Sequence, residues 1–456
     1  MENITVKDIV GMTGGVLMCG DENTPVTDIC INSKEIKEGD LFIPIIGERV
    51  DAHRFIESAL EKGAATLTSR HNDIVVAKKP YIRVDNTVDA LQRIGKEIRK
   101  QIPVPVVAVT GSVGKTTTRE MITQALSTAK RTFHTEKNLN SQIGVPITLS
   151  RMSRKDEIAV LELGISEPGQ MDILSEMVKP DMAVVTTIGV AHIEFMKTQE
   201  NIRKEKLSVV HFMKEGGTLL LNGDDELLKE AKEAEHLTCR TLFYGTSDWC
   251  DYYAKDIIYY DSYTAFTCVH GDKEVPVLLN TLGKHNVENC VAALAVANEN
   301  GIPMEVAAKG FEGFEGQRQR VIRLENKFTL IDDTYNASPD SMRASINVLC
   351  DIPCEGRRVA VLGDMFELGE NEIQYHKEIG QFLLDKPIDE VVVLGELSQN
   401  IKQVIEESES KIKVFTFSDN EEAAIYLMAT LKPEDIALIK ASNGMNLKEI
   451  VNILLA

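Results

Sequence analysis

Short apolar runs recur along the chain and alternate with longer segments in which apolar residues are three or four positions apart. The first clear run occupies 106–109, and further runs lie at 158–161, 182–185 and 218–221. Runs of this length, rich in β-branched residues, are typical of buried parallel strands, and the intervening segments are long enough for crossover helices. We therefore predict a central α/β domain with a mostly parallel sheet.

Two clusters of prolines and glycines divide the chain. Pro103 and Pro105 follow an amphipathic run at 88–98, and prolines disfavour continuation of a helix. The segment 310–316 holds three glycines, and after it strand-like runs resume at 328–331, 359–362, 391–394 and 436–439. We predict an α/β protein of three domains: a small mixed α/β domain at 1–102, the central domain at 103–313, and a Rossmann-like domain at 314–456.

Composition excludes several classes of function. The 456 residues carry 50 Lys and Arg against 70 Asp and Glu, a net charge of -20, with no basic block. Binding of DNA or RNA depends on clustered positive charge, so we expect no nucleic-acid partner. The eight cysteines lack zinc-site spacing, and neither an apolar run of about 18 residues nor an N-terminal leader pattern is found. We expect a cytoplasmic protein with reduced cysteines and no membrane span.

A glycine-rich loop follows the run at 106–109 and precedes a segment with helical apolar spacing. It reads Thr110-Gly-Ser-Val-Gly-Lys-Thr-Thr117. Such a loop surrounds phosphate oxygens with backbone N–H groups, while Lys115 supplies a positive charge and the Thr116 hydroxyl can bind Mg²⁺. The usual pattern has a glycine where this chain has Val109, so the loop is a shortened variant. The central domain is therefore expected to be P-loop ATPase-like, with phosphate contacts from Gly111, Ser112, Val113, Gly114, Lys115, Thr116 and Thr117.

Two residues that could hold a metal follow later strands of the central domain. Glu162 comes directly after the run at 158–161, and His192 follows the run at 182–185. The carboxyl ends of parallel strands meet at one edge of the sheet, where α/β sites form, so both are candidate Mg²⁺ ligands beside the loop. Lys204 and Lys206 lie in a predicted helix beyond His192, and their spacing alone indicates a solvated helix face.

Several motifs together resemble those of the Mur ligases, the ATP-dependent amide-forming enzymes of peptidoglycan precursor synthesis. In chain order they are the shortened loop, Asn138-Leu-Asn140 with Ile143-Gly-Val-Pro146, Glu162-Leu-Gly164, Ala191-His192, Gly283-Lys-His-Asn286 with Asn289, and Asp332-Asp-Thr-Tyr-Asn336. The stretches 332–342 and 362–369 are similar to those of the last enzyme of that pathway. This resemblance implies three domains, for UDP-substrate binding, ATP binding and ligation. It also implies D-alanyl-D-alanine, UDP-N-acetylmuramoyl-tripeptide and ATP as substrates.

The resemblance implies a role for each matching residue. Lys115 would contact the β- and γ-phosphates, Thr116 and Glu162 would hold one Mg²⁺, and His192 a second. Lys206 aligns with the lysine that the family carbamylates, which would make it an oxygen ligand. The nucleotide would be bound, besides the loop, by Asn138, His285, Asn286, Arg318 and Asp333. The other two substrates would be bound by Ser33, Lys34, Asn140, Tyr335 and Asn336.

Three positions depart from the family patterns. Asn32-Ser33-Lys34 replaces Asp-Ser-Arg, Asp51-Ala-His53 replaces Asp-Gly-His, and Lys440-Ala-Ser-Asn443 replaces Lys-Gly-Ser-Arg. The planar guanidinium of arginine can donate two parallel hydrogen bonds to an anion, whereas the ammonium group of Lys34 is a compact charge. The contacts to the UDP group are therefore expected to be remodelled. The loss of an arginine at Asn443 removes one possible clamp on a carboxylate or phosphate.

The chemistry expected is activation of a carboxylate by ATP, followed by attack of an amine on the acyl phosphate. Two alternatives remain open at this point. One is another ligase of the same type, such as a folylpolyglutamate-synthase-like or cyanophycin-type enzyme, and the other is a P-loop ATPase switch that makes no amide bond. The sequence leaves open whether the third residue of the tripeptide is lysine or meso-diaminopimelate. A monomer is expected.

Overall fold

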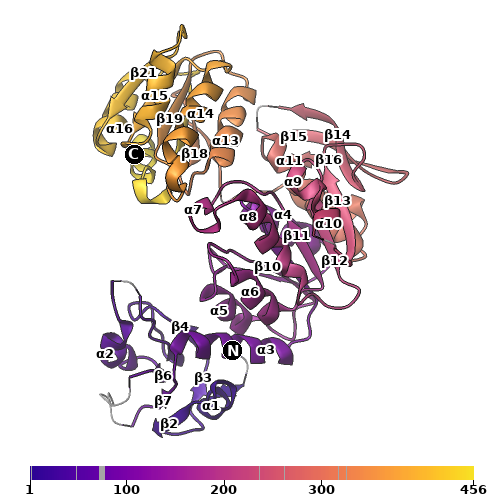
Figure 1. The fold of residues 1–456 in the computed structure, drawn as a ribbon, viewed down its shortest axis with the longest axis vertical. Helices are drawn as coiled ribbons and strands as arrows, with labels where there is room; N and C mark the ends of the chain where they lie inside the picture. The colour runs from indigo at the N-terminus through magenta and orange to yellow at the C-terminus, as the bar shows by residue number, and fades with distance from the viewer. Residues whose placement is uncertain are drawn as a thin grey trace.

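The computed structural model describes residues 1, 3–47, 49–70, 78–235, 237–260, 262–316, 318–324 and 326–456. Three large sheets follow one another along an elongated molecule, with the N-terminal part at the bottom of Figure 1 and the C-terminal part at the top. The predicted α/β class with three domains is confirmed. We propose residues 102 and 313 as the domain boundaries, because each large sheet then lies within one domain.

The N-terminal part is built around a five-stranded mixed sheet. Three of its neighbouring pairs are parallel, and one, at the β2 edge, is antiparallel. In spatial order the strands are β2 (Val16–Cys19), β7 (Tyr81–Arg83), β6 (Ala65–Thr68), β5 (Asp40–Phe42) and β4 (Asp28–Cys30). A second, two-stranded sheet pairs β1 (Ile4–Thr5) with β3 (Pro25–Val26). The helices are α1 (Val6–Thr13), α2 (Ile56–Leu60) and α3 (Thr87–Gln101).

Helix α3 joins the N-terminal part to the central part. Its first turn is capped by the Asn86 side chain, which accepts hydrogen bonds from the N–H groups of Val88 and Asp89. Leu91, Ile94 and Ile98 are buried in a core cluster that contains residues from both parts of the chain. The helix therefore fixes the position of the small sheet relative to the central one.

The central part has a nine-stranded sheet. From one edge to the other its strands are β16 (Lys273–Leu279), β15 (Thr264–His270), β14 (Tyr252–Tyr259), β13 (Arg240–Gly245), β12 (Thr218–Asn222), β11 (Met182–Val185), β8 (Val106–Thr110), β10 (Ile158–Glu162) and β9 (Thr132–His134). All pairs are parallel except β14–β15 and β15–β16. The sheet is covered by helices that include α4 (Lys115–Ser127), α5 (Gly144–Arg151), α6 (Gln170–Val178), α8 (Gln199–Leu207) and α11 (Lys284–Glu299). A mostly parallel sheet was predicted, and this is confirmed.

The C-terminal part contains a six-stranded sheet with one antiparallel edge strand. Its spatial order is β17 (Arg320–Arg323), β18 (Thr329–Asp333), β22 (Ile436–Lys440), β19 (Arg358–Gly363), β20 (Glu390–Leu394) and β21 (Lys413–Phe417). Core clusters lie on both faces, as expected of a doubly wound domain. The covering helices are α13 (Pro339–Asp351), α14 (Glu372–Leu384), α15 (Gln399–Glu406), α16 (Asn420–Thr430) and α17 (Lys448–Leu455).

Strand β8 lies inside the central sheet between two parallel neighbours. Leu161 of β10 is paired with Ala108 on one side, and Ala183 of β11 is paired with it on the other. The carboxyl ends of the three strands therefore meet at one sheet edge, which faces the C-terminal part (Figure 1). No helix among the described residues is both long and apolar enough to cross a membrane.

Candidate active site

The glycine-rich loop connects the end of β8 to the start of α4. Gly111 has φ 144° and Gly114 has φ 87°, both in the region that favours glycine. A Cβ atom at Gly111 would lie 1.8 Å from Oγ1 of Thr186, which follows the neighbouring strand β11. The loop can therefore take this shape only with glycine at 111, and it leads directly into the N-terminus of α4.

Lys115 is the first residue of α4, and its side chain turns back over the loop. Its Nζ donates hydrogen bonds to the backbone oxygens of Gly111 (2.8 Å) and Ser112 (3.3 Å). Burial lowers the pKa of Lys115 to about 8, a shift that Arg318 increases and Glu162 opposes. Nearby, the Ser112 hydroxyl is buried without a hydrogen-bond partner among the described residues, as expected of a donor that faces an anion site.

Glu162 ends strand β10 and lies directly beside the loop. Its Oε1 accepts hydrogen bonds from Oγ1 of Thr116 (3.2 Å) and Nδ2 of Asn140 (2.8 Å). Its Oε2 accepts one from Arg119 at 3.2 Å, and the Arg119 and Glu162 side chains are almost completely buried. The hydroxyl of Thr116 and the carboxylate of Glu162 thus form one oxygen-rich corner, held in place by the buried ion pair of Glu162 with Arg119.

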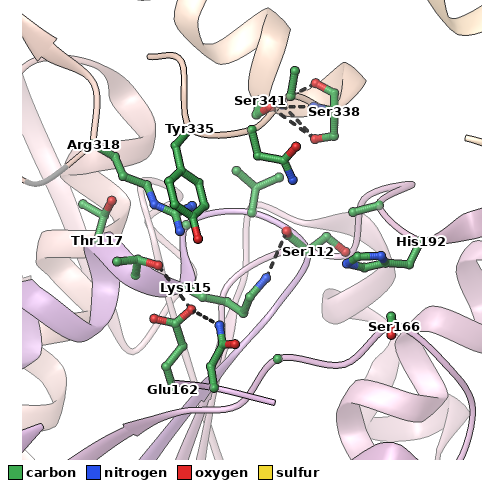
Figure 2. A pocket seen from close by; sticks show the side chains of 18 of the residues that line it. Ser112, Lys115, Thr117, Glu162, Ser166, His192, Arg318, Tyr335, Ser338 and Ser341 are labelled. Carbon is green, nitrogen blue, oxygen red and sulfur yellow. Dashed lines mark hydrogen bonds between the residues drawn. The ribbon is translucent and has the colours of Figure 1, made fainter. Parts of the chain in front are cut away.

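His192 lies in the loop after β11, on the other side of the phosphate loop (Figure 2). It has φ 63°, an uncommon conformation for a residue that is not glycine. Its Nδ1 lies 2.7 Å from Oε2 of Glu367, which comes from the C-terminal part. Burial lowers the pKa of His192; Lys115 and Lys206 lower it further, and Glu367 opposes the shift. The low pKa favours neutral imidazole, which is the form that binds metals.

Lys206 lies in α8 with only 3% of its surface exposed. Among the described residues its ammonium group has no hydrogen bond or ion pair. Burial, and secondarily Lys115, holds the pKa of Lys206 well below its ordinary value. The low pKa favours a neutral, nucleophilic amine. Because the side chain is buried, Lys206 does not belong to a solvated helix face, which the spacing of charged residues alone had indicated.

These groups surround a cavity of about 640 Å³ between the central and C-terminal parts. Its floor is the phosphate loop, and its opposite wall is formed by 335–338 together with α13. Val88, at the start of α3, also lines it, so the cavity extends toward the N-terminal part. The predicted site residues that line it are Ser112, Val113, Gly114, Lys115, Thr116, Thr117, Asn140, Glu162, His192, His285, Asn286, Arg318, Asp333, Tyr335 and Asn336.

One end of the cavity is closed by aromatic and amide groups. The guanidinium carbon of Arg318 lies 3.7 Å from the ring centroid of Tyr335, a cation–π contact visible in Figure 2. Oε1 of Gln319 lies 3.1 Å from Nε2 of His285 and accepts a hydrogen bond from Asn286 at 3.4 Å. This end therefore offers flat stacking surfaces and amide hydrogen-bonding groups, which suit a planar heterocycle.

Comparison with known proteins identifies the family. Three models match the chain: the Mur ligase family catalytic domain at 25–99, the Mur ligase middle domain at 109–297, and the Mur ligase glutamate ligase domain at 317–443. A Bacillus subtilis (strain 168) protein named UDP-N-acetylmuramoyl-tripeptide--D-alanyl-D-alanine ligase is 37% identical over 99% of this chain and 98% of its own length. The chain belongs to the Mur ligase family.

Further relatives of this Mur ligase match over nearly the whole chain. An Escherichia coli (strain K12) protein with the same name as the Bacillus one is 30% identical over 100% of this chain and 99% of its own. The crystal structure of MurF from Acinetobacter baumannii has a TM-score of 0.89 and 29% identity, and covers 99% of this chain and 98% of that one. MurF ligase from Thermotoga maritima in complex with ADP has a TM-score of 0.82 and 30% identity, with 94% and 97% covered.

Some predicted site residues of this Mur ligase lie away from the cavity wall. Ser33 and the exposed Lys34 are in the N-terminal part, and Asn138 is exposed beyond β9. Gly111, within the phosphate loop, and the buried Lys206 also do not line the cavity. The structure therefore gathers most of the predicted nucleotide-binding and metal-binding residues around one space, and leaves the predicted UDP contacts in another domain.

Three residues that belong to the site were not predicted from the sequence. Arg119 is one helical turn after Thr116, so a charged residue on the buried face of α4 was a usable signal. Glu367 lies within the stretch 362–369, which contributed to the family resemblance only as a motif. No local pattern distinguished Gln319, because its contacts with α11 depend on how the two domains meet.

The donors present suit a metal bound together with nucleotide phosphates. Among the described residues no group of three or more His, Cys, Asp or Glu side chains could hold a metal alone. Thr116 and Glu162 supply oxygen atoms and His192 a neutral nitrogen, and Mg²⁺ commonly takes its other ligands from phosphate and water. The residues therefore fit a Mg²⁺–nucleotide complex.

Replacing Gly111 by alanine is expected to weaken binding of a non-hydrolysable ATP analogue by about 5- to 150-fold. The added methyl group would collide with Thr186, and such overpacking costs ~1–3 kcal/mol. The matched control is Gly169→Ala, because Gly169 also has positive φ (82°) but has no atom within 4 Å of an added Cβ. Isothermal titration calorimetry of both variants tests this, and normal affinity of Gly111→Ala would exclude the loop as the phosphate site.

Proposed function

We propose that this Mur ligase joins D-alanyl-D-alanine to UDP-N-acetylmuramoyl-tripeptide, with conversion of ATP to ADP and phosphate. The names of the full-length relatives support this activity. The observation that carries it is the single cavity in which the phosphate loop faces residues 335–338 of the C-terminal part. Such an arrangement brings ATP, bound on one domain, against an amine substrate bound on the other.

The reaction has two chemical steps. The terminal carboxylate of the tripeptide attacks the γ-phosphorus of ATP, and the bond between that phosphorus and the ADP oxygen breaks to give an acyl phosphate. The free amine of the dipeptide then attacks the acyl carbon, the bond to phosphate breaks, and the amine loses a proton. Lys115 stabilises negative charge on the transferred phosphoryl group, and closure of the cavity excludes water that would hydrolyse the acyl phosphate.

Mg²⁺, when bound, neutralises charge on the phosphate oxygens. We propose that Thr116 and Glu162 contact one Mg²⁺ and that His192 and Lys206 belong to a second site. The neutral amine of Lys206 would bond to the carbon of CO₂ and release a proton, which gives a carbamate with two oxygen atoms. That change would also replace an uncharged buried amine by an anion beside Lys115, which is electrostatically favourable.

The nucleotide and dipeptide are assigned to adjoining parts of the cavity, which meet where Arg318 stacks on Tyr335. His285, Asn286 and Arg318 lie where stacking and amide contacts suit the adenine side of ATP. Tyr335 and Asn336 face the loop from the C-terminal part and would shape the dipeptide site. Asp333, which was assigned to the nucleotide, has its Oδ2 2.7 Å from Nζ of Lys440, so it also fixes this wall.

Two further residues are assigned to the UDP end of the long substrate. Ser33 and Lys34 lie in the N-terminal part, and Val88 extends the cavity wall toward that part. A UDP group bound there would direct the peptide along α3 toward the phosphate loop. We also propose a cytoplasmic monomer, because one chain supplies every element around the cavity.

The amine specificity tests this function. Phosphate release is measured with ATP, UDP-N-acetylmuramoyl-tripeptide and one amine at a time: D-alanyl-D-alanine, L-lysine, meso-diaminopimelate or glutamate. Turnover with the dipeptide alone is expected, with tripeptides ending in lysine and in diaminopimelate compared in parallel. Turnover only with a single amino acid would favour a different ligase of this family, and equal phosphate release without both acceptors would favour an ATPase switch.

A further inference from the structure

Two residues in left-handed backbone conformations face each other across the boundary between the central and C-terminal parts. His192 has φ 63° and Glu367 has φ 62°, and the Nδ1 of the first lies 2.7 Å from the Oε2 of the second. Residues other than glycine adopt this conformation only when the surrounding structure requires it, and such strain concentrates at functional sites. The contact is therefore held in place from both domains.

The C-terminal part contacts the chain on both sides of His192. On the N-terminal side, a Cβ at Gly189 would lie 2.1 Å from Oδ2 of Asp340 at the start of α13. On the C-terminal side, a Cβ at Gly369 would lie 3.3 Å from Cα of Glu194. The loop that carries His192 is thus packed directly against the C-terminal part, and Glu367 contacts its central residue.

A carboxylate at Nδ1 has a specific consequence for an imidazole. It stabilises the tautomer with hydrogen on Nδ1, which leaves the lone pair on Nε2 for a metal, and it makes that nitrogen a stronger ligand. Glu367 makes no other ion pair or hydrogen bond among the described residues, and its side chain is 53% exposed at the cavity. Nδ1 of His192 has no hydrogen bond of good geometry among the described residues, so the 2.7 Å approach of Oε2 of Glu367 is a close contact that becomes a hydrogen bond once the ring and the carboxylate align.

We propose that Glu367 is a positioning residue for the second Mg²⁺ site. It holds Nδ1 of His192 and so presents Nε2 to the metal, which makes this site complete only when the C-terminal domain is docked. The inference rests on the proposed two-metal ligase function. It also couples the two domains, because the domain proposed to bind the dipeptide orients a metal ligand on the domain proposed to bind ATP.

The test is metal binding by the full-length protein with a non-hydrolysable ATP analogue, with Mn²⁺ as a paramagnetic probe measured by electron paramagnetic resonance. The wild-type protein is expected to bind two Mn²⁺ ions. Glu367→Ala is expected to weaken the second site by about 10- to 100-fold and to leave the first unchanged. Glu367→Gln should retain part of the affinity, because the glutamine amide oxygen still accepts a hydrogen bond from Nδ1–H of His192. If Glu367 instead bound the metal directly, the amide would not replace its carboxylate.

Glu370→Gln is the matched control, since Glu370 is an exposed carboxylate three residues away that makes no ion pair or hydrogen bond with the other described residues. This variant should bind both ions normally. In turnover, Glu367→Ala should raise the KM for Mg²⁺ and recover most of kcat at high Mg²⁺, with an unchanged unfolding temperature.

Equal affinity of Glu367→Ala and wild type at the second site would overturn the inference and leave the proposed ligase intact. Binding of one Mn²⁺ by the wild type would instead overturn the two-metal site itself, and equal loss in Glu367→Gln and Glu367→Ala would identify Glu367 as a direct ligand.

Discussion

Lys115→Ala is expected to lower kcat by about 10³-fold or more. Among the described residues, Lys115 carries the only ammonium group that the carbonyl oxygens of the phosphate loop hold over that loop. Removal of one preorganised charge at a transferring phosphoryl group has effects of this size. The rate of phosphate release with all three substrates present gives kcat, and thermal unfolding verifies the fold.

Lys115→Arg is the control for charge alone. Arginine keeps the positive charge but cannot place a compact ammonium between the oxygens of Gly111 and Ser112, so partial activity is expected. The fold should survive Lys115→Ala, because burial already disfavours the charged form of Lys115, and thermal unfolding verifies the fold of the arginine variant. If Lys115→Ala retained more than a tenth of wild-type kcat, the assignment of the phosphate loop to catalysis would be wrong.

Lys206→Ala is expected to lower kcat on the order of 10²-fold or more and to regain activity with a small added carboxylic acid. The substitution removes the side chain proposed to carry a carbamate, and a free carboxylate can occupy the space and supply similar oxygen atoms. Stability should be kept, since the buried amine of Lys206 makes no hydrogen bond or ion pair among the described residues. Phosphate release is measured with and without formate, acetate or propionate.

Lys204→Ala on the same helix is the matched control, because Lys204 is exposed, and wild-type activity is expected. Rescue by carboxylic acids should be confined to Lys206→Ala. Unimpaired turnover of Lys206→Ala would remove the carbamate from the mechanism, and loss of activity without rescue would indicate that the lysine acts in another form.

The parts of the site that are continuous in sequence were predictable. The strand, glycine loop and helix around Lys115 are local, and each carries its own pattern. Glu162 and His192 were also predictable as neighbours, because the carboxyl ends of parallel strands meet at one sheet edge. The burial of Lys206 was not, because the spacing of charges on α8 does not reveal which side of the helix the core covers.

The contacts between domains could not be predicted from local patterns. Glu367 meets His192, and Gln319 meets His285, only because the C-terminal part docks against the central one. Strands β14, β15 and β16 were likewise not predicted from the sequence. These strands lie at the sheet edge and alternate buried and exposed residues, so they lack the continuous apolar runs of the central strands.

The central claim is that the enzyme activates the tripeptide carboxylate by phosphoryl transfer and then forms an amide. It is tested most directly with UDP-N-acetylmuramoyl-tripeptide in which both oxygens of the terminal carboxylate are ¹⁸O. With ATP and D-alanyl-D-alanine, mass spectrometry should find one ¹⁸O in the released phosphate and the other in the new amide of UDP-N-acetylmuramoyl-pentapeptide. Phosphate that carries no ¹⁸O would mean that water, rather than the substrate carboxylate, accepts the phosphoryl group, and would contradict the account.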